Sequence, residues 1–131
     1  MHWAAVFGWM VVIFIFSTDY FSDARTTAPL FKPTISFMIR KLAHWSEYFI
    51  LAVLLMRALN ARSAGFIAKR HMLWSVIWAV IYAVFDEWHQ SFVVSRQAKV
   101  ADVIIDAFGA ACGTLAWYWR KSVGARDAPR A

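Results

Sequence analysis

Long apolar runs separated by short polar stretches form the main pattern of this chain. The four runs cover residues 3–16, 37–56, 72–94 and 100–119. A bilayer core of about 30 Å is crossed by about 20 helical residues, so the last three runs are long enough to span it. The first run is shorter and is completed by Ser17 and Thr18, whose hydroxyls can bond backbone groups at its end. The pattern predicts an all-α fold, an integral membrane bundle of four transmembrane helices.

Residues 1–18 have a second interpretation, as a cleaved signal peptide. Such a peptide has Lys or Arg before its apolar core and small residues at a cleavage site after it. This chain begins Met1-His2, and no small-residue cleavage pattern follows Thr18. We therefore expect an uncleaved helix.

The polar stretches between the runs predict no further domain. Residues 19–36 combine two prolines with aromatic side chains, which is typical of a loop at the membrane interface. Residues 57–70 predict a short basic hairpin, and residues 120–131 a disordered polar tail. We therefore predict one transmembrane domain over residues 1–119 and a basic cytoplasmic tail over residues 120–131.

The composition agrees with a membrane protein. Hydrophobic residues make up 61% of the 131 residues, aromatic residues 18%, and the mean hydropathy is +0.50, which is too apolar for the surface of a soluble domain. The single Cys112 cannot form a disulfide within the chain, so cysteine usage gives no sign of the compartment.

The net charge of +6 bears on topology. Cytoplasmic loops of membrane proteins carry an excess of Lys and Arg. If both termini are cytoplasmic, the cytoplasmic segments hold eight of the fourteen basic residues, namely Arg57, Arg62, Lys69, Arg70, Arg120, Lys121, Arg126 and Arg130. We therefore predict that both termini are cytoplasmic. Such a basic face attracts anionic lipid, so membrane lipid is the expected partner and nucleic acid is not.

Charged and polar side chains gather on the outer side of this predicted bundle. They come early in the second run, late in the third and early in the fourth, and comprise Arg40, Lys41, His44, Glu47, Tyr48, Asp86, Glu87, Gln90, Asp102 and Asp106. The inner halves, 49–56, 72–85 and 107–119, contain no charge. A charge at the centre of a membrane helix costs about 2.5 to 3.5 kcal/mol. The acids must therefore share cations, protons or a ligand, or line a wet cavity.

Helical spacing gives the acids of the fourth run a common direction. Asp102 and Asp106 are four residues apart and so lie on one helix face. The same face continues to Gly109 and Gly113, a small-residue stripe that allows another helix to approach closely. We expect the acids to face the bundle, and a homo-oligomer could form through Gly109 and Gly113.

These polar segments resemble those of the VanZ-like family of bacterial integral membrane proteins. The resemblance rests on Arg40-Lys41-Leu-Ala-His44-Trp-Ser-Glu47-Tyr48, on Asp86-Glu87-Trp-His-Gln90-Ser-Phe92, and on Arg96 followed by Asp102-Val-Ile-Ile-Asp106-Ala-Phe-Gly109. It covers residues 10–118. Family members often have Pro-Gly before the Arg, where this chain has Val94-Ser95, so the resemblance bears less on this loop than on the polar segments.

The resemblance implies a multi-pass protein of the bacterial inner (plasma) membrane that acts in the cell envelope. It also implies a link to glycopeptide (teicoplanin) resistance, because the family's namesake has that link. It supplies no established reaction, and whether the chain is an enzyme stays open.

The candidate site residues fall into three chemical roles. The candidates for acid or base chemistry are His44, Glu47, Asp86, Glu87, Asp102 and Asp106. The candidates for holding a ligand are Arg40, Lys41, Tyr48, Gln90 and Arg96. Asp86, Glu87 and Asp106 are also candidate oxygen ligands of a divalent cation. Each role has a structural alternative. His44 could serve merely as a hydrogen-bonding group between two helices, and the cationic side chains could serve merely to reach lipid headgroups.

Three classes of function remain open. In the first, the polar site holds a lipid phosphate or a cell-wall precursor group without turnover. In the second, the chain is a metal-dependent enzyme on a lipid-linked phosphate, with carboxylates on the metal and cations on the phosphate. In the third, it is a small proton-linked transporter subunit whose buried acids titrate.

Overall fold

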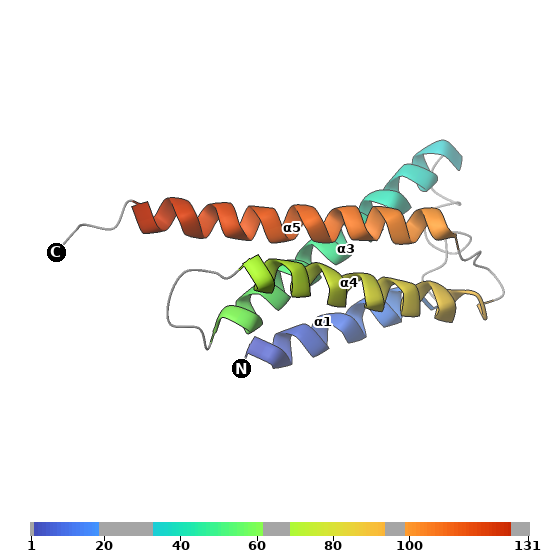
Figure 1. Cartoon of the computed structure of the whole chain (residues 1–131). Coiled ribbons are helices and arrows are strands. Elements are labelled where there is room, and N and C mark those ends of the chain that lie inside the picture. The colour runs from blue at the N-terminus through green and yellow to red at the C-terminus, as the bar shows by residue number, and fades with distance from the viewer. Residues whose placement is uncertain (1, 19–32, 62–68, 94–98, 127–131) are drawn as a thin grey trace.

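The computed structural model describes residues 2–18, 33–61, 69–93 and 99–126, and every regular element in these residues is an α-helix. The helices are α1 (His2–Phe16), α3 (Pro33–Asn60), α4 (Lys69–Gln90) and α5 (Val100–Arg126) (Figure 1). Two helical stretches, Thr34–Asn60 and Val100–Gly124, are long and apolar enough to cross a membrane, by length and composition. The all-α prediction is confirmed, whereas four membrane spans stay a prediction.

Three predicted boundaries were wrong. The hairpin predicted over residues 57–70 is shorter, because α3 continues to Asn60 and α4 begins at Lys69. The loop predicted over residues 19–36 ends earlier, because α3 already begins at Pro33. Proline suits the first helical position, where its fixed φ is helical and its missing N–H has no partner to lose. The disordered tail predicted from residue 120 was also wrong over residues 120–126, which continue α5. Residues 19–32 lie outside the described residues.

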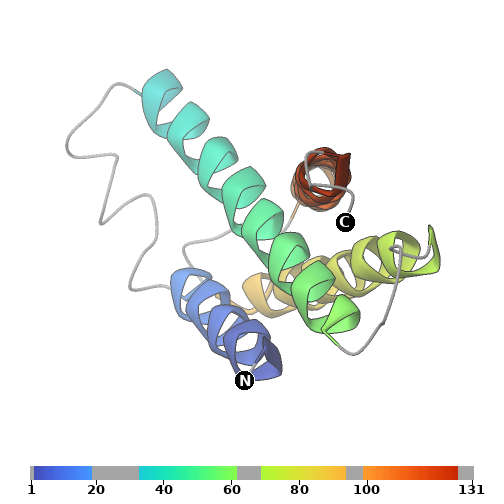
Figure 2. The same ribbon diagram turned by 90° about the vertical axis from the view of Figure 1, so that its left-hand side faces the viewer.

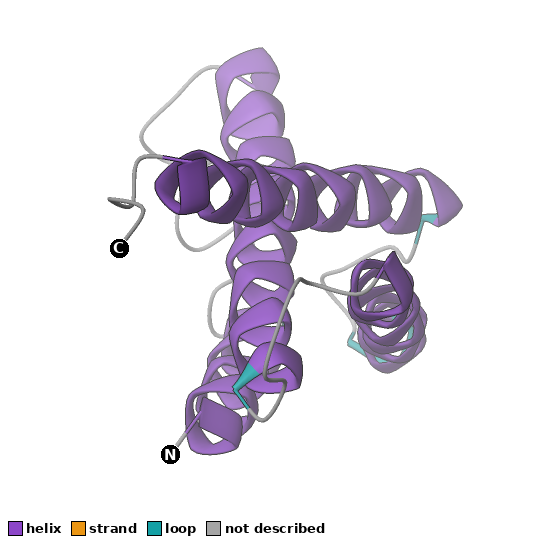
Figure 3. Cartoon of the chain, turned by 60° about the vertical axis from the view of Figure 1, so that its left-hand side comes forward, coloured by secondary structure: helices purple, strands orange, loops and turns teal. Residues whose placement is uncertain are grey.

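Helix α3 is the centre of the bundle. It contacts each of the other three helices, and its most extensive contact is with α5. Figure 2 shows α3 passing obliquely between α1 and α5, and Figure 3 shows α5 lying across α3. Polar groups on the first turns of α3 can therefore meet those of both α4 and α5.

Two glycines allow the close crossing of α3 and α5. A Cβ atom on Gly109 would overlap the carbonyl oxygen of Trp45, and one on Gly113 would overlap that of Phe49. The predicted close approach at this stripe is confirmed, with α3 of the same chain as the partner. A homo-oligomer through Gly109 and Gly113 stays a prediction, although α3 already occupies this face.

Large apolar side chains cover the outside of the bundle. The exposed ones include Phe7 on α1, Leu42 on α3, Trp78 on α4 and Phe108 on α5. The carboxylates of α4 and α5 are buried instead. A water-soluble domain rarely exposes so much apolar surface, whereas a helix bundle in lipid does. The outer surface therefore suits hydrocarbon better than water.

The two ends of the bundle differ in which segments they hold. The start of α1, the end of α3, the start of α4 and the end of α5 lie together on the left of Figure 1. The end of α4 and the start of α5 lie at the opposite end. The start of α1 and the end of α5 are therefore on one side of the bundle. Which side faces the cytoplasm stays a prediction.

Candidate functional site

Buried polar side chains from three helices gather at the end of the bundle where α4 ends and α5 begins. They are His44 and Tyr48 from α3, Asp86, Glu87 and Gln90 from α4, and Asp102 and Asp106 from α5. None of these residues is more than 6% exposed. We call this set the polar cluster. The inward direction of its acids agrees with the expectation from sequence, whereas their depth in a membrane stays a prediction.

Helical periodicity places these groups on facing surfaces. His44 and Tyr48 are four residues apart on α3, as are Asp102 and Asp106 on α5. Residues with this spacing lie on one face, one turn apart. The close crossing of α3 and α5 then brings the two pairs together in the interior.

One ion pair joins α3 to α5. The Lys41 ammonium contacts the Asp102 carboxylate, and both side chains are largely buried. The ammonium also lies 5.1 Å from the centre of the Phe37 ring. Flanking cations were expected to be partners of the acids, and this pair bears out that expectation for Lys41. A buried pair of this kind is sensitive to loss of either partner, since the remaining charge is left uncompensated.

The neighbouring acids Asp86 and Glu87 have different partners. Asp86 accepts a hydrogen bond of 2.9 Å from the Gln90 amide, one turn along α4. Glu87 Oε2 accepts a 2.8 Å bond from the backbone N–H of Lys99, immediately before α5. Consecutive residues on a helix point in different directions, which explains the division. Glu87 thus fixes the end of α4 against the start of α5.

His44, Glu87 and Asp106 form the innermost group of the cluster. One ligand atom from each lies within 4.8 Å of the others. The His44 Nδ1 atom is 3.3 Å from Asp106 Oδ1, without the alignment of a hydrogen bond. Among the described residues, neither Asp106 oxygen, nor Glu87 Oε1, nor the Tyr48 hydroxyl has a hydrogen-bond partner. The cluster therefore contains buried oxygen atoms whose bonding capacity is unused.

The charges of the cluster do not balance within the residues that the structure describes as buried there. Four carboxylates, of Asp86, Glu87, Asp102 and Asp106, face the Lys41 ammonium and the His44 imidazole. An uncompensated buried charge costs several kcal/mol. Within this set negative charges outnumber positive ones, and protons, a bound cation or the cations at the edge of the cluster, such as Arg40, would offset them.

Some predicted site residues lie elsewhere. Glu47 is only partly buried, and its backbone carbonyl accepts a 2.9 Å bond from the Trp9 indole N–H. Arg40 is partly buried at the edge of the cluster, 5.8 Å from the Phe37 ring centre. Arg96 lies outside the described residues. The metal-ligand set predicted from sequence also differs, because the converging group contains His44 in place of Asp86.

Sequence reasoning missed the polar contacts in the apolar half of the bundle. The buried Ser75 hydroxyl donates to the Ala52 carbonyl at 3.1 Å and lies 3.3 Å from the Thr114 hydroxyl. These contacts join α4 to α3 and α5. Single Ser and Thr residues within apolar runs are the available signal, because such side chains commonly bond across membrane helices.

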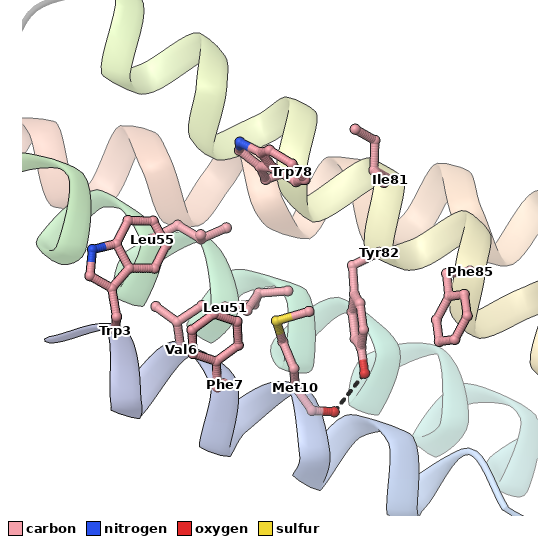
Figure 4. Close-up of a pocket in the computed structure, with 10 residues that line it drawn as sticks. All are labelled: Trp3, Val6, Phe7, Met10, Leu51, Leu55, Trp78, Ile81, Tyr82 and Phe85. Atoms are coloured by element: carbon pink, nitrogen blue, oxygen red, sulfur yellow. Dashed lines mark hydrogen bonds between the residues drawn. The ribbon is translucent and has the colours of Figure 1, made fainter.

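An apolar groove of about 440 Å³ lies between α1 and α4 over α3 (Figure 4). It is lined by Trp3, Val6, Phe7, Met10, Leu51, Leu55, Trp78, Ile81, Tyr82 and Phe85. The Tyr82 hydroxyl donates a 2.6 Å bond to the Met10 carbonyl across it. The lining carries no charged side chain, so the groove suits hydrocarbon and is chemically unlike the polar cluster.

A family model described as VanZ/LLP1 matches residues 2–121 of the chain. The matched range contains α1, α3 and α4, most of α5, and all residues of the polar cluster. Comparison with curated proteins gives no match, and neither does comparison with solved structures. The family resemblance inferred from the polar segments is confirmed.

Proposed function

This chain belongs to the VanZ/LLP1 family, and from that premise we propose that it is a multi-pass protein of the bacterial cell membrane that holds a phosphate group on its polar cluster. The phosphate would belong to a lipid or to a lipid-linked cell-wall precursor. Binding of this kind would alter access of glycopeptides such as teicoplanin to the envelope.

The observation that carries the proposal is the burial of polar residues from three helices at one end of a bundle with an apolar outside. Small residues such as Gly109 and Gly113 already provide close helix packing. Charged groups within a membrane are costly, and most of those that occur serve a ligand, an ion or a proton. The polar cluster is therefore better explained by binding than by assembly alone.

Cationic side chains at the edge of the cluster supply the attraction for phosphate. Arg40 and Lys41 lie on the first turns of α3, and the exposed Lys99 lies immediately before α5. The Lys41 ammonium is held by Asp102, so little of its side-chain freedom remains to be lost on binding. Tyr48 and Gln90 would add hydrogen-bonding groups, and Arg96 remains a candidate cation outside the described residues.

The test measures binding of a phosphomonoester lipid. Purified protein in nanodiscs would be titrated with phosphatidic acid, with phosphatidylcholine as the neutral reference. Arg40→Gln should weaken binding about fivefold, the equivalent of about 1 kcal/mol for one cation near the membrane surface. Arg57→Gln, at the opposite end of α3, is the matched control. Equal losses in both variants would show general attraction to anionic lipid and would overturn a defined site.

A second candidate is a metal-dependent enzyme on a lipid-linked phosphate. The convergence of His44, Glu87 and Asp106 favours it, because these groups could place a cation beside a phosphate held by Arg40. Phosphate release from a panel of lipid-linked phosphates would be followed with Mg²⁺, with Mn²⁺ and with chelator. Turnover lost with chelator and in Glu87→Gln would favour the enzyme. Binding without any product would favour the first proposal.

The cellular role has a separate test. A host that expresses the chain should survive a higher teicoplanin concentration than the same host without it. Variants that lack Glu87, Asp102 or Asp106 should lose this protection while reaching the membrane at normal levels. Full protection by these variants would remove the polar cluster from the function.

A further inference from the structure

We propose that His44, Glu87 and Asp106 bind one divalent transition-metal ion, with Zn²⁺ as the best-suited ion. The proposal is independent of phosphate binding, because it concerns the interior of the cluster and not its cationic edge. It replaces the sequence-based set of Asp86, Glu87 and Asp106 with one in which an imidazole nitrogen takes the place of a carboxylate.

The three ligands converge from three separate helices. His44 comes from α3, Glu87 from α4 and Asp106 from α5, and one donor atom of each lies within 4.8 Å of the others. Two donors that each lie about 2.1 Å from a tetrahedral ion are separated by about 3.4 Å. The observed 3.3 Å between His44 Nδ1 and Asp106 Oδ1 agrees with that separation. The third donor, from Glu87, lies within 4.8 Å of the other two.

Unused bonding capacity points to the same position. Asp106 is fully buried, and neither of its oxygens accepts a hydrogen bond from any described residue. Glu87 Oε1 also accepts no hydrogen bond from a described residue, whereas Glu87 Oε2 accepts one from the Lys99 N–H. Buried carboxylate oxygens are nearly always bonded in folded proteins, so exceptions need a cause such as a bound ion. An ion among these atoms would satisfy the oxygens of Glu87 and Asp106 together.

The surrounding groups suit a metal site. The buried Tyr48 hydroxyl, also without a hydrogen-bond partner among described residues, lies one turn after His44 on α3. The Lys99 N–H fixes the orientation of Glu87, as second-layer hydrogen bonds do for metal ligands. A divalent ion would also offset the excess of carboxylates in the cluster.

The donor set selects the class of metal. Mg²⁺ and Ca²⁺ prefer all-oxygen sites, whereas an imidazole with two carboxylates suits a first-row transition ion. Three protein ligands leave a coordination position for water or for a substrate oxygen. Zn²⁺ is therefore the first probe, and Mn²⁺ is the second.

The experiment uses the full chain in detergent, stripped of metal and titrated with Zn²⁺ alone. Calorimetry and elemental analysis should give one Zn²⁺ per chain, and saturation should raise the melting temperature. Glu87→Gln and Asp106→Asn should each weaken binding at least tenfold, and so should His44→Gln. His71→Gln is the matched histidine control, because His71 lies at the opposite end of α4. No lipid phosphate is present in this titration, so a failure to bind Zn²⁺ is distinct from a failure of the proposed phosphate binding.

Several results would overturn the site. Wild-type protein that binds neither Zn²⁺ nor Mn²⁺ would show that His44 and Asp106 form only an ion pair. Equal loss of Zn²⁺ in His71→Gln would assign binding to surface histidines. Unchanged Zn²⁺ affinity in His44→Gln would reject His44 as the third ligand, and loss in Asp86→Asn would then restore the set with Asp86.

Folding is checked separately, since neutralised buried groups can destabilise the bundle. Circular dichroism and gel filtration of each variant should match those of the wild type. If a variant fails to fold, Co²⁺ bound to the wild type gives an independent answer. Its visible absorption should show a four- or five-coordinate ion with nitrogen and oxygen ligands, and the spectrum of hydrated Co²⁺ would contradict the proposal.

Discussion

The two ends of the bundle hold the same helices together by different means. At the polar end, α3 and α5 are joined by the pair of Lys41 and Asp102, and α4 is joined to the start of α5 through Glu87. At the apolar end, the same helices meet through small residues and through the hydroxyls of Ser75 and Thr114. The apolar end shows that this bundle can pack without charge.

That difference bears on function. In lipid, helices associate through close packing of small residues and a few polar contacts. Ala79, Ala83 and Ala110 supply such packing in the core. The charges of the polar end therefore exceed what assembly requires, and the groove beside α1 has no charged side chain in its lining. Ligand chemistry belongs at the polar end.

The largest expected effect is an all-or-none difference in cysteine labelling, which shows which end of the bundle faces the cytoplasm. In a Cys112→Ser background, Ser91→Cys would report on the polar end and Ala61→Cys on the other. The excess of basic residues predicts that a membrane-impermeant maleimide labels only Ser91→Cys in intact cells. Both sites should react after permeabilisation. Labelling of Ala61→Cys in intact cells would reverse the topology and place the polar cluster on the cytoplasmic side.

The largest energetic effect is expected at the ion pair of the polar end. Asp102→Asn leaves the Lys41 ammonium without its partner and should lower the free energy of unfolding by about 3 to 5 kcal/mol. The double variant Lys41→Leu with Asp102→Leu should lose less, because no unpaired charge remains. Thermal melting in detergent, followed by circular dichroism, measures both. Unchanged melting of Asp102→Asn would mean that the pair contributes nothing to stability.

Sequence patterns were sufficient to place the acids of the polar cluster together at one end of the bundle interior. Runs of about 20 apolar residues determine which turns share a level, and spacing by four determines which side chains share a helix face. Asp86, Glu87, Asp102 and Asp106 were accordingly expected in the bundle interior, where they lie.

The pairing of these groups could not be predicted in the same way. Whether His44 meets Asp106 or Asp86 depends on the crossing of α3 and α5, which spacing within one helix does not determine. The partner of Glu87 is a backbone N–H, and every non-proline residue offers one. The continuation of α5 to Arg126 was missed because basic residues read as a tail also favour a helix C-terminus.

A smaller effect is expected where the two ends meet, at the glycine stripe. Gly113→Leu places a side chain against the Phe49 carbonyl and must move the α3 backbone. Overpacking of this kind should cost about 1 to 3 kcal/mol and should also disturb the polar cluster. Gly8→Leu is the matched control, because Gly8 has open space around it. Equal melting of the two variants would contradict the close crossing.

The smallest effect is expected at the single neutral hydrogen bonds that attach α1 to α3 and α4. Tyr82→Phe removes the 2.6 Å bond to the Met10 carbonyl and keeps the ring that lines the groove. Hydrogen bonds between membrane helices contribute about 0.6 kcal/mol on average, so the loss should stay below about 1 kcal/mol. Trp9→Phe, which removes the hydrogen bond to the Glu47 carbonyl, should cause a similarly small loss of stability.

Melting of these two variants beside Asp102→Asn compares neutral hydrogen bonds with the buried ion pair directly. Tyr82→Phe and Trp9→Phe should lower the free energy of unfolding several-fold less than Asp102→Asn does, because removing a neutral donor leaves no unpaired charge in the interior. A loss of stability at Tyr82 as large as at Asp102 would mean that neutral and charged contacts stabilise the bundle equally. The charges of the polar cluster would then need no ligand to explain them.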